Sequence, residues 1–266
     1  MYRDSRVVVV MPAYNAEQTL RRSFAEVCAQ GVVDVVVIVD DCSRDGTEQV
    51  AREIAKAARL ESASGPGLEV IYRRHDRNLG YGGNQKTCYR LALEARADIV
   101  VMVHPDCQYT PKLLPAMVSM IAAGLHPCVL ASRILGGYAL KGGMPWWKYV
   151  VNRFLTASMN LMMGAKLSEY HTGYRAFSAE LLRKLPLERN TDDFAFDAQM
   201  LAEILATGAT IGEVSCPTVY SPEASSINFA RSCKYGFGCL GAALRYRFAK
   251  GSLLAGEGEQ RSPRPT

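Results

Sequence analysis

Four short runs of apolar, mostly β-branched residues alternate with segments of helical periodicity along the first hundred residues. The apolar runs cover 6–11, 32–39, 68–72 and 99–103, and the helical segments cover 16–30, a stretch ending near 60, and 84–95. Buried strands of parallel sheets read as continuous apolar runs, and parallel neighbours need a crossover that is usually a helix. This alternation predicts an α/β fold with a mostly parallel sheet and helices on both faces.

Polar side chains follow these runs, with Tyr14 after the first, Asp40 and Asp41 at the end of the second, and Asp106 after the fourth. Ligands of open parallel sheets bind in the crevice beyond the carboxyl ends of the strands. We therefore expect these four side chains to line one ligand-binding crevice. The first strand–helix turn lacks a G-x-G-x-x-G motif, which disfavours a dinucleotide-dependent dehydrogenase.

The composition is that of a globular protein with a sizeable core. Of the 266 residues, 48% are apolar and 21% are charged, which excludes disorder, collagen and coiled coil. The net charge of +5 is small and diffuse. It suits ligands that carry phosphate groups, or an anionic membrane surface, and it does not indicate nucleic acid.

Cysteine usage and the N-terminus bear on the compartment. The eight cysteines include no C-x-x-C pair, and the N-terminal apolar run is too short for a signal peptide. No stretch reaches the roughly 18 consecutive apolar residues that a membrane span needs. These features predict a cytoplasmic protein with reduced thiols and no membrane-spanning segment.

The second half contains two amphipathic helical patterns, over 146–164 and 235–250, the second followed by a polar tail. In the first, Lys148 and Asn152 lie on the face opposite an apolar stripe. The stripe consists of Trp147, Val150, Phe154, Ala157 and Leu161. Two arrangements fit this pattern: a helix that packs its stripe on the sheet, or an interfacial helix with aromatic rings at headgroup depth and cations on lipid phosphates.

Six segments, in this order, resemble the motifs of glycosyltransferase family 2. They are VVVVMPAYNAE (7–17), VIVDDCSRDGT (37–47), RNLGYGGNQ (77–85), VVMVHPDCQYTP (100–111), ASR (131–133) and HTGYRAFS (171–178). Within the family they are most similar to polyprenyl-phosphate (dolichyl-phosphate) sugar synthases. The resemblance covers about the first 180 residues, and it implies a GT-A fold, which is Rossmann-like.

The resemblance also implies a division of the chain. A GT-A domain is expected over 1–230, an amphipathic C-terminal helix over 231–250 and a disordered tail over 251–266. Within the domain, about 1–110 would bind the nucleotide and about 111–230 the acceptor. The implied reaction is the inverting transfer of a sugar from a UDP- or GDP-sugar to a polyprenyl phosphate.

The first segments form the expected nucleotide site. Asp40 and Asp41 end a strand, where a carboxylate can accept a hydrogen bond from a base N–H or a ribose hydroxyl. Alternatively Asp41 and Ser43 cap the next helix, although capping needs fewer acids than this tandem supplies. The expected nucleotide-binding residues are Pro12, Ala13, Tyr14, Asn15, Asp40, Asp41, Ser43 and Gly80.

The segment from His104 to Gln108 lies where similar enzymes carry D-x-D followed by Gln, whose acids hold Mg²⁺ or Mn²⁺ on the diphosphate. The resemblance makes Asp106, Gln108 and His104 the expected metal ligands, and Asp106 a catalytic residue. Because His104 replaces the first acid, we expect a weaker site that favours Mn²⁺ over Mg²⁺. The alternative is a structural, hydrogen-bonded His104.

Arg133 lies where similar lipid-phosphate transferases bind the acceptor phosphate, which a guanidinium can pair with bidentately. Its alternative role is a surface salt bridge. Lys148 and Asn152 take the positions of the family's second Arg and its Ser. Arg175 is expected either at the diphosphate or as a buttress of its loop. The Arg and the G-x-S-K that close over the donor in similar synthases are replaced at 221–228 by an unrelated sequence.

Three functions remain open from the sequence. The first is a polyprenyl-phosphate sugar synthase, peripheral at the inner face of the membrane, which Arg133 and the cationic helix over 146–164 favour. An anionic acceptor of this kind needs no general base. The second is a soluble family 2 transferase that acts on a hydroxyl of a polysaccharide or small metabolite, with Asp192 or Asp193 as base; otherwise these acids cap the next helix. The third is a non-catalytic nucleotide-sugar binding module, suggested by His104.

Overall fold

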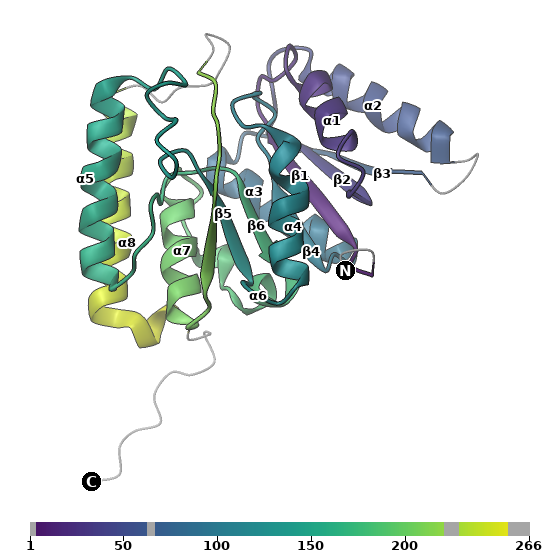
Figure 1. The fold of residues 1–266 in the computed structure, drawn as a ribbon. Coiled ribbons are helices and arrows are strands. Elements are labelled where there is room, and N and C mark those ends of the chain that lie inside the picture. Colours follow the sequence, from purple (N-terminus) through teal and green to yellow (C-terminus); the bar gives the residue numbers. More distant parts are fainter. Residues whose placement is uncertain (1–3, 63–66, 221–228, 255–266) are drawn as a thin grey trace.

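A computed structural model describes residues 4–62, 67–220 and 229–254 of the protein. A single mixed sheet runs through these residues. Its strand order is β3-β2-β1-β4-β6-β5-β7 (Figure 1). The strands are β1 (Val7–Ala13), β2 (Val35–Asp40), β3 (Glu69–Arg74), β4 (Ile99–Met102), β5 (Cys128–Ser132), β6 (Arg175–Ser178) and β7 (Ile211–Ser215). The four predicted apolar runs correspond to β1 through β4.

Most neighbouring strands are parallel. β1 pairs in parallel with β2 and β4, β2 with β3, and β5 with β7, whereas β6 is antiparallel to both β4 and β5. The predicted mostly parallel α/β sheet is therefore confirmed. Because β1, β2 and β4 run in the same direction, the loops that follow them lie at one edge of the sheet.

Helices cover both faces of the sheet (Figure 1). They are α1 (Leu20–Cys28), α2 (Thr47–Ser62), α3 (Gly80–Glu94), α4 (Leu114–Ala122), α5 (Trp146–Met163), α6 (Ala179–Lys184), α7 (Phe196–Ala206) and α8 (Phe229–Leu253), with short 3₁₀ turns at Pro111–Leu113 and Leu187–Arg189. Alternate residues of β1 enter different cores: Val8 and Val10 pack in the core that includes α3 and α7, and Val9 and Met11 in the one that includes α1 and α4. A strand buried on both faces explains the unbroken apolar run.

The helix α5 presents its apolar stripe to the outside. Phe154 is 65% exposed and Leu161 is 86% exposed, whereas Asn152 and Thr156 on the opposite face are buried. The arrangement in which the stripe packs on the sheet is therefore wrong. α5 instead packs along α8 (Figure 1), and its inward polar side chains are hydrogen-bonded.

The helix α8 contains the predicted segment 235–250 and begins a few residues earlier. It also carries exposed apolar side chains, Phe237, Leu244 and Phe248. Among the described residues no helix has the length and apolar character that crossing a membrane requires. Most of the tail predicted to be disordered, 251–266, and the segment 221–228 lie outside the described residues.

Candidate functional site

Hydrogen bonds join the loops that follow β1 and β2. The Asn15 backbone N–H donates to the Ser43 hydroxyl at 2.9 Å, which brings the two loops together at the carboxyl edge of the sheet. Pro12 and Ala13 are buried within β1, so the backbone is what they offer to a ligand. Tyr14 is 46% exposed and presents its ring at the rim. Among the predicted nucleotide residues of this loop, Tyr14 is therefore the one whose side chain a base can stack on.

Asp40 is fully buried at the end of β2. Its Oδ1 accepts hydrogen bonds from the backbone N–H and the hydroxyl of Ser43, at 2.9 and 2.5 Å. Its Oδ2 lies 3.3 Å from Arg74 Nε and has no hydrogen-bond partner in the described part of the chain. This buried oxygen is the remaining acceptor of the Asp40 carboxylate.

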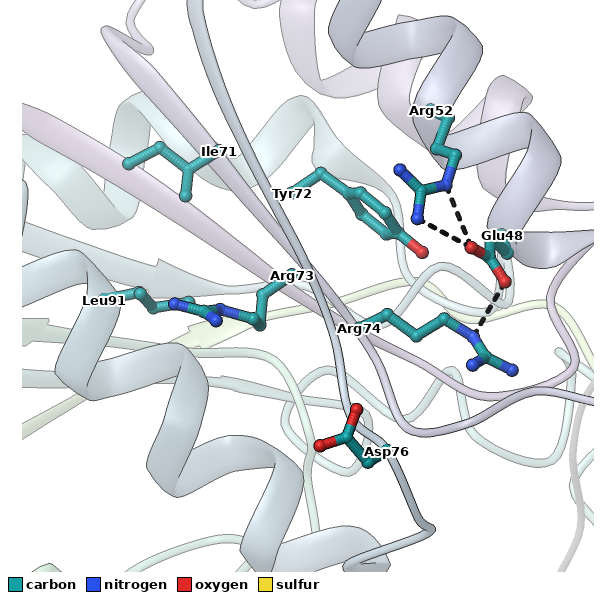
Figure 2. Close-up of a pocket in the computed structure, with 8 residues that line it drawn as sticks. All are labelled: Glu48, Arg52, Ile71, Tyr72, Arg73, Arg74, Asp76 and Leu91. Atoms are coloured by element: carbon teal, nitrogen blue, oxygen red, sulfur yellow. Dashed lines mark hydrogen bonds and ion pairs between the residues drawn. The ribbon is translucent and has the colours of Figure 1, made fainter.

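A hollow of about 400 Å³ lies beside β3 and the start of α2 (Figure 2). Its lining residues are Glu48, Arg52, Ile71, Tyr72, Arg73, Arg74, Asp76 and Leu91. In Figure 2 the Arg74 side chain points toward Glu48, and its Nε lies 2.9 Å from the carboxylate. Burial, with the Asp40 charge, raises the pKa of Tyr72 to about 12. Sequence reasoning missed Arg74, because a basic residue at a strand end has no distinguishing pattern.

Asp41 holds the loop that leads into α3. It is 3% exposed, lies 2.8 Å from His75 Nδ1 and accepts the backbone N–H groups of Leu79 at 2.7 Å and Gly80 at 3.0 Å. These contacts make Asp41 an anchor of this loop, and its nucleotide contact stays a prediction. Gly80 itself has φ +87°, and a Cβ there would lie 2.7 Å from the Asp192 carbonyl oxygen.

The loop after β4 carries His104 and Asp106. His104 Nε2 lies 3.1 Å from the Tyr81 hydroxyl, and the two rings stack with centroids 5.4 Å apart. The Tyr81 hydroxyl in turn donates to Asp197 Oδ2 on α7, at 2.8 Å. Asp106 Oδ1 accepts the backbone N–H of Gln108 at 3.0 Å. His104 is thus both hydrogen-bonded, as in the structural alternative, and next to the expected acidic ligand.

Burial dominates the electrostatics of this loop. It lowers the pKa of His104, against the opposing effect of the Asp106 and Asp197 carboxylates, and it raises the pKa of Asp106, against the effect of His104. No three His, Cys, Asp or Glu side chains of the described residues form a metal-binding cluster. His104 and Asp106 would therefore leave the other ligands of a divalent cation to a bound diphosphate and water.

Arg133 follows β5, and several hydrogen-bond acceptors surround its guanidinium. Its guanidinium pairs with the fully buried Glu169 carboxylate and donates to the Tyr220 hydroxyl at 2.9 Å and the His171 carbonyl oxygen at 2.8 Å. Asn152 Nδ2 on α5 donates to the same Glu169 oxygen at 2.9 Å. Burial by itself would raise the pKa of Glu169, but the charge and hydrogen bonds of Arg133, together with the effect of His171, outweigh burial and hold that pKa below its usual value.

Of the three predicted acceptor residues, Arg133 and Asn152 come together, and Glu169 joins them. Lys148 does not share their contacts, because its ammonium lies over the Trp147 ring, 5.4 Å from the centroid. Sequence analysis gave Glu169 no function. Its signal was weak, since it is a single acid that precedes the HTGYR segment.

Arg175 is fully buried at the start of β6. Its Nε donates to the Thr172 carbonyl oxygen at 2.7 Å and its Nη2 to that of Tyr170 at 3.0 Å. Nη2 also lies 3.4 Å from Asp197 Oδ2. Of its two expected roles, these contacts match the buttress, and the diphosphate contact stays a prediction.

Asp192 and Asp193 lie beside the start of α3 and are both ion-paired. Asp192 Oδ1 lies 2.7 Å from Lys86 Nζ, and its side chain is 63% exposed. Asp193 Oδ1 accepts the Phe194 backbone N–H at 2.8 Å, and its Oδ2 lies 2.5 Å from Lys234 Nζ. Asp193 therefore binds the backbone ahead of α7, whose N-cap Ala195 receives no side-chain hydrogen bond, and the carboxylate of Asp192 is largely exposed.

The mixed sheet with this strand order has the GT-A fold. The model of the family named glycosyl transferase family 2 matches residues 8–186, and the chain belongs to that family. The match covers the six segments on which the sequence resemblance was based, except the first residue of the first one.

Named relatives include enzymes that use lipid phosphates. UDP-N-acetylglucosamine–dolichyl-phosphate N-acetylglucosaminyltransferase of Methanococcus voltae is 27% identical over 82% of this chain and 87% of its own. Undecaprenyl-phosphate mannosyltransferase of Micrococcus luteus is 25% identical over 79% of this chain and 82% of its own. The sequence resemblance to polyprenyl-phosphate sugar synthases is thereby confirmed.

Solved structures share the fold. Glucosyl-3-phosphoglycerate synthase from Mycobacterium tuberculosis, in complex with Mn²⁺, UDP and phosphoglyceric acid, superposes with a TM-score of 0.64 at 19% identity. The superposition covers 92% of this chain and 79% of that one. At this identity the likeness establishes the GT-A fold alone.

Proposed function

We propose that this protein transfers a sugar from a UDP- or GDP-sugar to a polyprenyl phosphate, with inversion at the anomeric carbon. The observation that carries the proposal is the outer surface of α5 and α8, here called the α5–α8 face. Its exposed apolar side chains are Trp146, Val150, Val151, Phe154, Leu161, Phe237, Leu244 and Phe248. Neither helix contains an Asp or Glu, whereas Arg245, Arg247 and Lys250 are exposed on α8. Two helices that expose apolar and cationic side chains but contain no acidic residue suit an anionic lipid surface.

The same helix links this face to Arg133. Asn152 lies on the inward side of α5 and binds Glu169, which in turn holds the Arg133 guanidinium. A lipid whose chain rests against the α5–α8 face would therefore bring its phosphate toward a fixed guanidinium. We propose that the acceptor binds in this half, about 111–230, and the nucleotide in about 1–110. The protein would then be cytoplasmic and peripheral at the inner face of the membrane.

The proposed chemistry divides between the two ends of the crevice. Tyr14 stacks on the base and Asp40 Oδ2 accepts one of its N–H groups or a ribose hydroxyl. His104 and Asp106 would hold Mg²⁺ or Mn²⁺, which supplies positive charge for the departing diphosphate. Arg133 orients the acceptor phosphate, whose oxygen is already anionic and attacks without a general base.

The test is a panel of UDP- and GDP-sugars incubated with Mn²⁺ or Mg²⁺ and a short polyprenyl phosphate, with nucleoside diphosphate release as the readout. We expect release with one donor that depends on the lipid phosphate. The second candidate is a hydroxyl acceptor, which the solvent-exposed carboxylate of Asp192 favours. Release that ignores polyprenyl phosphate and is lost in Asp192→Asn or Asp193→Asn would favour that candidate. Tight donor binding with no release would favour a binding module.

The Asp106→Asn variant is expected to lower lipid-dependent release about 100-fold, because it removes the charged oxygen ligand expected at the diphosphate. Steady-state rates at saturating donor measure the loss. Glu180→Gln is the matched control, since that carboxylate is 79% exposed on α6 and pairs with Lys184. A rate of Asp106→Asn close to that of wild type would contradict the proposed role.

Membrane contact has its own prediction. The double variant Phe154→Ser, Phe248→Ser is expected to sediment much less with vesicles that contain phosphatidylglycerol, because it removes two of the largest exposed apolar side chains of the α5–α8 face. Leu60→Ser on α2 is the control, with a side chain that is equally exposed but lies elsewhere. Equal sedimentation of the double variant and the control would contradict membrane contact through this face.

A further inference from the structure

The His104 ring is confined on several sides. Its Nε2 meets the Tyr81 hydroxyl, and its plane stacks on the Tyr81 ring at an interplanar angle of 19°. The Tyr81 ring is itself stacked on Phe194, with centroids 4.8 Å apart. At Gly173 a Cβ would lie 2.6 Å from His104 Cδ2, so the backbone abuts that edge of the imidazole. The ring therefore has a defined orientation.

The direction of the hydrogen bonds fixes the position of the imidazole proton. The Asp197 carboxylate accepts from Gln85 Nε2 at 3.2 Å and faces Arg175 Nη2 at 3.4 Å, so it acts as an acceptor. Tyr81 has one hydroxyl proton, and it donates this proton to Asp197. The Tyr81 oxygen is then left as the acceptor for His104, which must carry its proton on Nε2.

The lone pair of neutral His104 is therefore on Nδ1. In an imidazole, Nδ1 lies across the ring from Cδ2, and Cδ2 is the atom that faces Gly173. Nδ1 has no hydrogen bond to any described residue, and the His104 side chain is partly exposed. The Asp106 carboxylate, two residues along the same loop, interacts electrostatically with the ring.

We infer that Tyr81 and Asp197 are positioning residues that hold His104 in the tautomer with a free Nδ1. In this tautomer, Nδ1 and the Asp106 carboxylate form a mixed nitrogen–oxygen site for a divalent transition-metal cation. Imidazole nitrogen binds Mn²⁺ and later transition metals in preference to Mg²⁺, which favours oxygen ligands. A carboxylate behind a metal-binding histidine is a common way to fix the ring and raise its basicity. Here the Tyr81 hydroxyl lies between the Asp197 carboxylate on α7 and the His104 ring, and it links the two. The inference deepens the proposed function and rests on its metal site.

The first test needs neither metal nor nucleotide. The chain has four histidines, so long-range ¹H–¹⁵N spectra of ¹⁵N-histidine-labelled protein can assign the His104 tautomer by comparison with His104→Ala. We expect the Nε2–H form in wild type and a mixture of forms in Tyr81→Phe, which keeps the ring but loses the hydroxyl. Tyr174→Phe is the matched control, because the Tyr174 hydroxyl is buried without a hydrogen-bond partner.

The second test measures metal affinity by the electron paramagnetic resonance signal of free Mn²⁺ in the presence of UDP, with Mg²⁺ added as competitor. Tyr81→Phe is expected to weaken Mn²⁺ binding about tenfold or more, to change Mg²⁺ binding little, and therefore to lower the Mn²⁺/Mg²⁺ affinity ratio. The Tyr174→Phe control is expected to keep the wild-type ratio. A merely structural role for Tyr81 would weaken both cations alike.

Two results would overturn the inference: an Nδ1–H tautomer in wild type, or a Mn²⁺/Mg²⁺ ratio that Tyr81→Phe leaves unchanged. Neither result bears on the proposed function, because lipid-dependent nucleoside diphosphate release is measured separately. Conversely, absence of any transfer would reject the proposed function, while the tautomer of His104 would still decide the role of Tyr81.

Discussion

The Glu169→Leu variant is expected to lose about 3–5 kcal/mol of unfolding free energy, the largest stability loss we foresee for a single substitution in this protein. Glu169 is fully buried, and the Arg133 side chain that it neutralises is 12% exposed. Removing the carboxylate leaves the guanidinium charge inside the protein with uncharged acceptors, and it deprives Asn152 of its acceptor. Urea-induced unfolding at neutral pH measures the effect.

The control for Glu169→Leu is the double variant Arg133→Met, Glu169→Leu. Replacing both members of a buried ion pair by apolar residues of similar size is often nearly neutral, so we expect the double variant to recover most of the lost free energy. A loss below about 1 kcal/mol in Glu169→Leu alone would show that the pair behaves like an exposed salt bridge.

The same double variant separates the structural and functional roles of Arg133. If the double variant is folded yet its nucleoside diphosphate release no longer responds to polyprenyl phosphate, Arg133 acts on the acceptor. If its lipid-dependent release matches wild type, the frame around Glu169 serves stability alone.

The parallel part of the fold was accessible from the sequence because local pattern determines it. Strands buried on both faces, such as β1, must be apolar at every position, and this leaves an unbroken run. The strand β6 escaped prediction because it has four residues and begins with Arg175, whose burial depends on carbonyl groups of its own loop and on Asp197. A strand of that composition carries no apolar run.

The candidate site was predictable where a residue's position in a motif decides its place, as for His104 and Asp106 at the end of β4. The role of a side chain was not predictable where it depends on a partner that is distant in the sequence. The carboxylate of Asp41 is occupied by the loop that includes His75, and that of Glu169 by Arg133, 36 residues earlier in the chain. The inward face of α5 was missed because it combines Asn152, the partner of Glu169, with the buried apolar residues Leu155 and Met159, whereas the longer apolar stripe lies outside.

The stability of the protein is expected to fall as the pH is lowered from about 6.5 to 4, with His171 responsible for up to about 3 kcal/mol of the loss. Burial lowers the pKa of His171 to about 4, with the Arg133 and Arg175 charges adding to burial and Glu169 opposing it. The unfolded chain takes up the proton near pH 6.5, whereas the folded protein resists it until pH 4. Protonation of His171 therefore favours the unfolded state throughout this pH window. Above pH 6.5 neither state binds the proton, and the protein keeps its full stability.

The His171→Gln variant isolates this contribution, because glutamine keeps a polar partner for the Tyr235 hydroxyl, which lies 2.7 Å from His171 Nδ1. Unfolding free energies of the two proteins at pH 7.5, 6.5, 5.5 and 4.5, chosen as roughly even steps across the window, give a difference curve. We expect wild type to lose stability relative to the variant as the pH falls, by a slope approaching about 1.4 kcal/mol per pH unit. Glu169 is present in both proteins, but His171 helps to lower its pKa, so the difference curve reports His171 together with its effect on Glu169. Parallel curves would mean that the folded protein binds the His171 proton as readily as the unfolded chain does.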